Sequence, residues 1–350
     1  MKRNYSLDVI KLLLAYVIVL FHFDKWVAPG PTVTVQIFFM ISGFFLARKF
    51  YNRSYGDGET RYGPWQYTLD HAKALYPHYV LALVLFLGYS LVRSLVYFVA
   101  APSGQGLQDM LTMIYDQLPD LVFLQSAFQY DANLNAPTWQ LSALMIAGYF
   151  VYALLCHNEK LSRTLIFPAG ILMIQCLLHT GVDLFSRYGC FYMPLLRAFS
   201  PMCLGVLTYR FSTTDMYHRF RQNKGLFHGL GLLALPAMMI FEDRNDLHLL
   251  WTAVLILNCM EPESIVNRLL NRKCFAGCGK LSYILYLNHA MFARFYINIL
   301  IKLLQKTGIG MPEWLYTPVY LVLLTAFCLV LQWLTERLQN RCRKKAAGNV

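Results

Sequence analysis

Residues 75–100 read LYPHYVLALVLFLGYSLVRSLVYFVA, and Arg93 is the only Lys, Arg, Asp or Glu among these 26 residues. As an α-helix the run would extend about 39 Å, which exceeds the roughly 30 Å of hydrocarbon in a bilayer. A helix on the surface of a soluble domain needs a broad polar face, and this run has none. The run is therefore predicted to cross a membrane.

The rest of the chain has the same character. Of its 350 residues, 57% are hydrophobic and 14% are charged, whereas a soluble protein carries about 25% charged residues. Nine more apolar runs occur, at 7–23, 33–50, 138–156, 164–180, 191–209, 226–241, 247–259, 281–303 and 315–334. We therefore predict an all-α polytopic membrane protein with about ten transmembrane helices, in a single domain 1–350 with spans over about 7–335 and a basic tail at 336–350. The run 247–259 is short, so whether it crosses fully stays open.

The distribution of positive charge predicts the orientation. The net charge is +12. If the chain crosses the membrane ten times, 22 of the 31 Lys and Arg residues lie on the same side of the membrane as the N-terminus, and four lie in the loops on the opposite side. Cytoplasmic segments of membrane proteins carry such an excess. Both termini are therefore expected in the cytoplasm, and loop 101–137, which has no Lys or Arg, is expected outside. Anionic lipid accounts for the basic surface, so no nucleic-acid partner is expected.

Ionisable side chains inside the spans are candidates for function because they are costly to place in lipid. Lys11 and His22 are 11 residues apart, which is a net rotation of about 20° on a helix, so both share one face. His289 shares a face with Ser282 and adjoins Tyr286. The alternatives are a snorkelling Lys11, an interfacial His22 and a helix–helix hydrogen-bond network around His289. No metal-ligand spacing or phosphate-binding loop occurs, so neither a metal site nor a permanently bound cofactor is expected.

Six motifs follow one another along the chain. They are Lys11 followed by ten residues and His22, FFMISGF at 38–44, LYPHY at 75–79, WQLS at 139–142, RAFSPMCLG at 197–205, and LSYILYLNH at 281–289. Together, over about 7–335, they resemble the integral-membrane acyltransferase-3 family. The chain departs from the family pattern where Lys11 replaces the usual Arg, where Leu144 stands in place of a common Glu, and where only Lys73 is near the positions of the arginines before span three.

The resemblance implies an O-acyltransferase of the bacterial plasma membrane. It would move an acyl group, acetyl by family usage, from cytoplasmic acyl-CoA to a hydroxyl of an envelope glycan or lipid-linked sugar. His22 would act as general base, or become acylated, with His289 as a second catalytic residue. Acyl-CoA, the donor substrate, is expected to bind at Lys11, Arg48, Lys49, Lys73, Ser42 and Gly43. Substrate contacts are expected at Trp139, Arg197, Ser282, Tyr283, Tyr286 and Asn288, and the oxyanion donors are expected among Ser282, Tyr283, Tyr286, Asn288 and His289.

Two other classes remain as alternatives. Ten spans with buried basic residues would also suit a transporter or exporter of a polysaccharide or small solute, although no paired, broken-helix repeats are visible. The other class of multi-span acyltransferases, the membrane-bound O-acyltransferases, uses an Asn and a distant His, whereas Asn288 is adjacent to His289. The acceptor, the acyl chain and the oligomeric state are not predicted.

Overall fold

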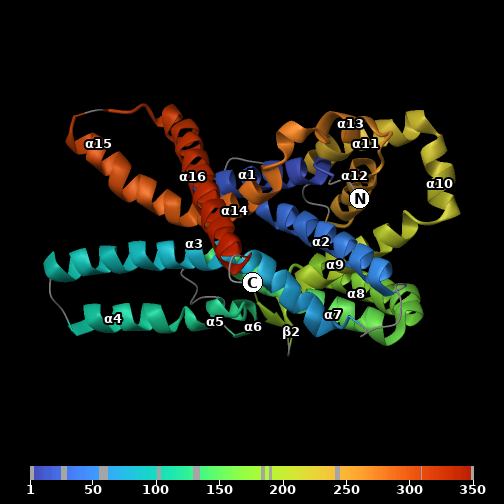
Figure 1. The fold of residues 1–350 in the computed structure, drawn as a ribbon, viewed down its shortest axis with the longest axis horizontal. Helices are drawn as coiled ribbons and strands as arrows, with labels where there is room; N and C mark the ends of the chain where they lie inside the picture. Colours follow the sequence, from blue (N-terminus) through green and yellow to red (C-terminus); the bar gives the residue numbers. More distant parts are fainter. Residues whose placement is uncertain are drawn as a thin grey trace.

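The structure, a computed structural model, describes residues 4–24, 30–54, 62–100, 104–128, 135–182, 186–188, 191–240, 245–308 and 310–347. The described chain is almost entirely helical, and helices contain most of each of the ten predicted apolar runs (Figure 1). Two strands of two residues each, β1 (Arg187–Tyr188) and β2 (Phe191–Tyr192), pair antiparallel with Arg187 opposite Tyr192. The predicted helical, multi-span architecture is confirmed, with this small hairpin as an addition.

The first half of the chain begins with three long helices. The long helices are α1 (Ser6–Asp24), α2 (Pro31–Ser54) and α3 (Pro64–Ala100). They are followed by α4 (Gly104–Tyr115), α5 (Leu118–Leu121), α6 (Gln125–Phe128), the short turn η1 (Ala136–Thr138), α7 (Trp139–Leu161), the π-helical turn η2 (Ser162–Ile166) and α8 (Phe167–His179). In Figure 1, α4 runs back alongside α3, and the two helices pack together.

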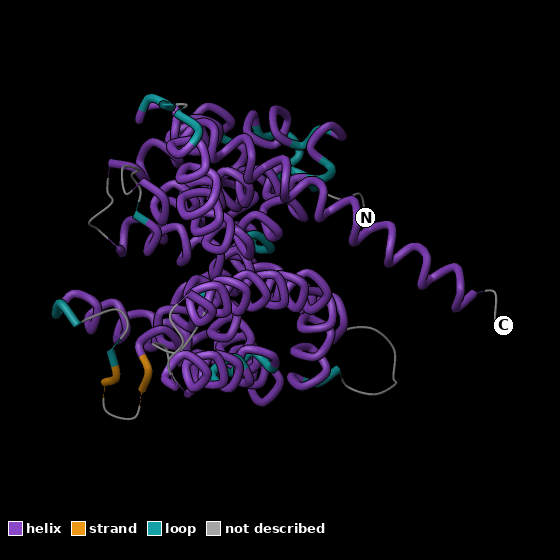
Figure 2. The backbone as a smooth tube through the Cα atoms, turned by 90° about the vertical axis from the view of Figure 1, so that its left-hand side faces the viewer, coloured by secondary structure: helices purple, strands orange, loops and turns teal. Residues whose placement is uncertain are grey.

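The second half adds the helices that complete the bundle. They are α9 (Met193–Phe211), α10 (Asp215–Gln222), α11 (Lys224–Ile240), α12 (Asn245–Met260), α13 (Ile265–Leu270), η3 (Lys273–Phe275), α14 (Cys278–Phe295), η4 (Tyr296–Ile301), α15 (Lys302–Lys306) and α16 (Glu313–Ala347). Helix α16 continues well past the predicted span 315–334, and its last turns project away from the rest of the molecule (Figure 2). Helix α3 likewise begins at Pro64 rather than at residue 75.

Proline and a threonine cap mark several helix starts. Pro31 and Pro64 are the first residues of α2 and α3. The backbone N–H at this position makes no hydrogen bond within a helix, so a proline, which lacks the N–H, is well tolerated there. Pro194 occupies the first turn of α9 in the same way. Thr214 precedes α10, and its side chain accepts a hydrogen bond from the backbone N–H of Tyr217 at 3.3 Å.

Helices α2 and α9 cross in backbone contact because each contributes a glycine. A Cβ built on Gly43 would lie 2.1 Å from the carbonyl oxygen of Met202, and one on Gly205 would lie 2.2 Å from that of Met40. Small residues at such crossings let two membrane helices approach closely. This crossing therefore fixes α9 against α2 at the centre of the fold.

Helix α14 is the second organising element. It packs along α1 and also contacts α3 and α16. Near its start, the ammonium group of Lys280 lies 2.9 Å from Oε1 of Glu336 on α16. Because α14 touches three of the long helices, any side chain on its inner faces meets residues from distant parts of the sequence.

Six helical segments of the described residues are long and apolar enough to cross a membrane. They are Ser6–Phe23, Val33–Asn52, Pro64–Val96, Ala136–His179, Lys273–Lys306 and Glu313–Arg341. Helix α12 has 16 residues, about 24 Å, which is short for a full crossing. A multi-pass membrane protein is therefore supported, whereas the number of ten crossings and the side of each terminus stay predictions.

Candidate functional site

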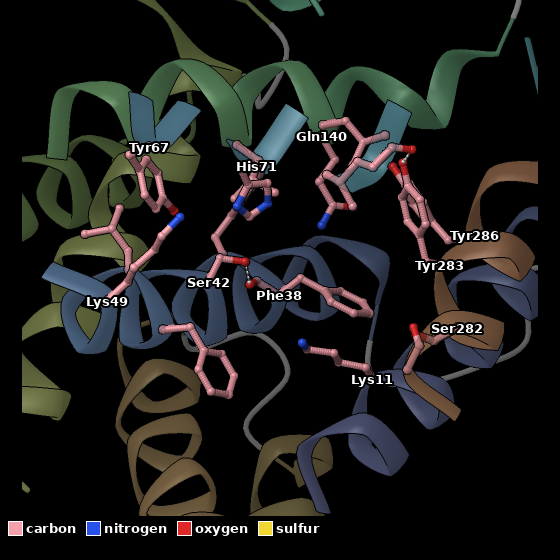
Figure 3. Close-up of a pocket in the computed structure, with 17 residues that line it drawn as sticks. Lys11, Phe38, Ser42, Lys49, Tyr67, His71, Gln140, Ser282, Tyr283 and Tyr286 are labelled. Atoms are coloured by element: carbon pink, nitrogen blue, oxygen red, sulfur yellow. Dashed lines mark hydrogen bonds between the residues drawn. The ribbon is translucent and has the colours of Figure 1, made fainter. Parts of the chain in front are cut away.

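A cavity of about 360 Å³ lies among α1, α2, α3, α7 and α14. Figure 3 shows the polar side chains that extend into it from these five helices. They are Lys11, Ser42, Lys49, Tyr67, His71, Gln140, Ser282, Tyr283 and Tyr286. The cavity thus brings together side chains that are more than 270 residues apart in the chain.

Helical spacing explains how each element supplies this lining. Ser42 and Lys49 are seven residues apart on α2, so they lie two turns apart on one face. On α3, Tyr67 and His71 are four residues apart and also share a face. Tyr283 and Tyr286 follow the same rule on α14, so one inner face of each helix forms the wall.

Two lysines make the cavity cationic, and aromatic rings surround their ammonium groups. Lys11 Nζ lies 5.4 Å from the centroid of the Phe45 ring. Lys49 Nζ lies 4.7 Å from the ring of Tyr62 and 5.3 Å from that of Tyr67, and 3.5 Å from Oδ2 of Asp70. An ammonium group is attracted to the face of an aromatic ring, so these rings help to hold both lysine side chains in place. The cavity is therefore suited to an anionic ligand.

Four hydroxyl groups of the cavity donate their protons to backbone carbonyl groups. Ser42 donates to the oxygen of Phe38 at 2.8 Å, and Ser282 to that of Gly279 at 3.0 Å. The tyrosine hydroxyls bond in the same way, Tyr283 to Leu75 at 3.1 Å and Tyr286 to Pro137. Since a hydroxyl has one proton, these four groups can accept a hydrogen bond from a ligand but have no proton left to donate.

Two histidines meet just beyond this cavity. The ring centroids of His22 on α1 and His289 on α14 are 5.0 Å apart, and the Tyr286 ring, which lines the cavity, lies 6.0 Å from that of His289. His22 is exposed, whereas His289 is fully buried. Neither is among the residues that line the cavity.

The backbone fixes the tautomer of both rings. Nδ1 of His22 lies 2.9 Å from the carbonyl oxygen of Ile18, and Nδ1 of His289 lies 2.7 Å from that of Tyr286. A carbonyl oxygen only accepts, so each neutral ring carries its proton on Nδ1 and has a lone pair on Nε2. Within the described residues, Nε2 of His289 has no hydrogen-bond partner. The pair thus offers two unprotonated nitrogens of the kind a general base requires.

A second cavity, of about 420 Å³, adjoins the first. Its polar lining includes Lys73 and His78 from α3 and Lys280 from α14. Leu75, Gly279 and Tyr283 line both cavities, so they form the boundary between the two. Lys73 is expected to bind acyl-CoA together with Lys11 and Lys49, and the structure places it in this second cavity rather than in theirs.

Several predicted site residues lie away from both cavities. Gly43 is in contact with the backbone of α9, so its small size serves helix packing rather than a ligand. Arg197 is 2% exposed and lies over the Trp139 ring at 5.2 Å, as a packed pair in the core. Asn288 donates to the carbonyl oxygen of Ile284 at 2.8 Å. Arg48 is on α2 but is not among the residues that line either cavity.

Three polar lining residues were not predicted for the site: Tyr67, His71 and Gln140. Gln140 is the second residue of the WQLS motif, and its polar amide inside an apolar run was the available signal. Tyr67 and His71 precede the apolar run at 75–100 and were visible only as the same face of a longer helix. Their role depends on α3 starting at Pro64, which the apolar run does not reveal.

The fold and the site together define a class of protein: a multi-pass membrane protein with a cationic cavity that ends beside a pair of histidines. The family model described as an acyltransferase domain of the acyltransferase-3 type matches residues 4–333. The chain belongs to this family and is a membrane acyltransferase, which confirms the predicted resemblance. No curated protein and no solved structure matches the chain.

Proposed function

We propose that this acyltransferase moves an acetyl group from cytoplasmic acetyl-CoA to a hydroxyl group of a cell-envelope glycan or lipid-linked sugar, with His22 as general base. The observation that carries the proposal is the position of the His22–His289 pair at the end of a cationic cavity. The proposed location is the plasma membrane of a bacterium.

The two ends of the cavity differ in a way that suits a thioester donor. Lys11 lies early in α1, Lys49 late in α2 and Ser282 early in α14, so the cationic part is at the end of the bundle where α1 begins. Under the positive-inside prediction this end faces the cytoplasm, where acyl-CoA is found. The phosphates of the donor would meet the lysines, and the acyl end would reach Tyr286.

The chemistry then needs a base at the acyl end. Nε2 of His22 would take the proton of the acceptor hydroxyl as its oxygen attacks the acyl carbon. The carbonyl electrons move to the oxygen, and their return breaks the C–S bond. The thiolate of CoA leaves and receives the proton from His22. The neighbouring His289 ring, which has a free Nε2, would accept a hydrogen bond from protonated His22.

The exposure of the two rings supports different roles for them. His22 is exposed and late in α1, so an acceptor from the outer side can reach it. His289 is buried, so its effect would pass through His22. A positioned general base typically contributes about 10²–10⁴ of the rate.

The test uses the purified protein in liposomes that contain the total envelope lipids of a bacterium as the acceptor source. Release of free CoA from acetyl-CoA and transfer of labelled acetyl to the lipid fraction are measured for the wild type and for His22→Ala. His218→Ala is the control, because His218 is exposed on α10 and lines neither cavity.

We expect the wild type and His218→Ala to transfer acetyl, and His22→Ala to lose at least about 100-fold in rate while still binding acetyl-CoA. Turnover retained in His22→Ala would remove His22 from the chemistry. A wild type that neither binds acetyl-CoA nor releases CoA would overturn the donor and favour transport of a solute.

A further inference from the structure

Gln140 has an unusual position for a buried amide. It is the second residue of α7, is 6% exposed and lines the first cavity. Its Oε1 is buried without a hydrogen-bond partner, and no described residue forms a hydrogen bond with either atom of the side-chain amide. A buried polar group without a partner is costly. The cavity therefore contains an amide whose Oε1 would accept a hydrogen bond from a ligand and whose N–H groups have no partner among the described residues.

On the Tyr286 side of the cavity the hydroxyl groups cannot supply a donor, and the imidazole of His71 lies on the far side of Gln140 from Tyr283 and Tyr286 in Figure 3. The hydroxyls of Ser42, Ser282, Tyr283 and Tyr286 each donate to a backbone carbonyl group. Tyr67 lies beside Lys49, at the other side of the cavity in Figure 3. Gln140 is thus the uncommitted amide donor on the Tyr286 side.

The course of α7 places Gln140 at the acyl end. The last turns of α7 lie beside the end of α2, where Tyr51 donates to Glu159. The start of α7 lies at α14 instead, where Tyr286 donates to Pro137 and Asn135 Nδ2 donates to Leu287 at 2.9 Å. Gln140 therefore lies near Tyr286, the residue between the cavity and His289.

The start of α7 adds a favourable potential. A helix N-terminus carries roughly half a positive charge, so it stabilises a negative charge that lies close to it. The Thr138 side chain does not cap this helix; it donates to the carbonyl oxygen of Asn135 at 2.8 Å. An oxygen that becomes negative near Gln140 would feel both the amide N–H and this dipole.

We propose that the side-chain N–H of Gln140 donates a hydrogen bond to the carbonyl oxygen of the acyl thioester and stabilises the oxyanion formed in transfer. The inference rests on the proposed function. As the acceptor oxygen attacks the acyl carbon and its proton passes to His22, the carbonyl oxygen gains the electron pair and becomes negative. The N–H of Gln140 stabilises this oxyanion by a hydrogen bond until the C–S bond breaks. A neutral donor in a water-poor site is effective because it needs no reorganisation.

The test compares steady-state kinetics of Gln140→Leu and Gln140→Glu in the same liposomes with acetyl-CoA. Leu matches the size of Gln without a donor, and ionised Glu has acceptors only. The control is Gln175→Leu, because Gln175 on α8 also has a buried Oε1 without a partner but is not a lining residue of either cavity.

We expect kcat of Gln140→Leu to fall about 10²–10³-fold with KM for acetyl-CoA changed less than about threefold. The kcat of Gln140→Glu should fall at least as far as that of Gln140→Leu, and the kcat of Gln175→Leu should match that of the wild type. The melting temperature of Gln140→Leu should equal or exceed that of the wild type, because a buried amide without a partner is removed.

Two outcomes would overturn the proposal. A kcat near that of the wild type in Gln140→Leu would exclude an oxyanion donor. A raised KM with unchanged kcat would show that the amide only binds the donor in the ground state. If Gln140→Leu unfolds, Gln140→Glu decides by the same two criteria. These outcomes leave the proposed function intact, whereas a wild type without CoA release overturns the function itself.

Discussion

Replacing Gly43 by alanine tests the packing of α2 on α9, and the structure sets the expected size of the effect. The added Cβ would lie 2.1 Å from the carbonyl oxygen of Met202, where ordinary contact begins at 3.4 Å. The two backbones must therefore separate by about 1.3 Å at the crossing. A gap of 0.5–1 Å already forfeits a quarter to a half of each dispersion contact. Overpacking destabilises a protein by about 1–3 kcal/mol. We expect a value of about 3 kcal/mol here, because the added Cβ would meet backbone atoms rather than a side chain that can move.

The measurement is the melting temperature of the purified protein in detergent, together with KM for acetyl-CoA. A loss of about 3 kcal/mol should lower the melting temperature by roughly 4 °C, because the unfolding entropy of a chain of 350 residues is about 0.7 kcal/mol/K. Gly88→Ala is the matched control on α3, because a Cβ there meets nothing within 4 Å. That variant should melt at the wild-type temperature or slightly above, since alanine favours a helix over glycine.

One result would refute this reasoning. If Gly43→Ala melted like the wild type and only raised KM for acetyl-CoA, Gly43 would face the donor, as its sequence context suggested. An equal loss of melting temperature in Gly88→Ala would show that the effect belongs to helical glycines in general. A selective loss in Gly43→Ala with unchanged KM would confirm the crossing.

Two further predictions concern charge. Asp120, in the segment before α7, is fully buried, and burial raises the pKa of its carboxyl group from the usual 3.8 to about 7. The folded protein therefore keeps this proton to higher pH than the unfolded chain, so stability is greatest below about pH 4 and falls as the pH rises to about 7, by roughly 4 kcal/mol at most. Asp120→Asn should flatten the melting temperature between pH 5 and pH 8, and an unchanged slope would contradict the assignment. Lys11→Ala should raise KM for acetyl-CoA roughly 10- to 100-fold, because a charge-assisted hydrogen bond is lost. Lys11→Arg should keep most of the binding. Equal losses of binding in the two variants would argue against a phosphate contact.

Much of the fold could be predicted because membrane helices leave a local signal. A continuous apolar run of sufficient length has few other stable outcomes in lipid, so helices contain most of each predicted run. The ends were less well predicted. Helix α3 starts at Pro64 and α16 ends at Ala347, because polar turns at the ends of a helix need no lipid and carry no hydropathy signal.

The candidate site was predicted in part. Lys11, Ser42, Lys49, Ser282, Tyr283 and Tyr286 do line one cavity. Ser42 and Gly43 could not be told apart from the sequence, because a small patch on a helix serves a ligand and a neighbouring helix equally well. Ser42 faces the cavity while Gly43 faces α9. The two residues are consecutive on the helix, so their side chains point about 100° apart. Only the positions of the neighbouring helices decide what each of these two directions faces.

The sequence by itself determined that the chain is a helical membrane protein of the acyltransferase-3 family and which residues share each helix face. Those properties depend on composition and on local spacing, which a single sequence contains. Tertiary structure alone decided that His22 meets His289, that Gln140 is left without a partner among the described residues and that Tyr286 stands between the cavity and the histidines. These facts depend on which helices become neighbours, and that order is set by contacts between residues far apart in the chain.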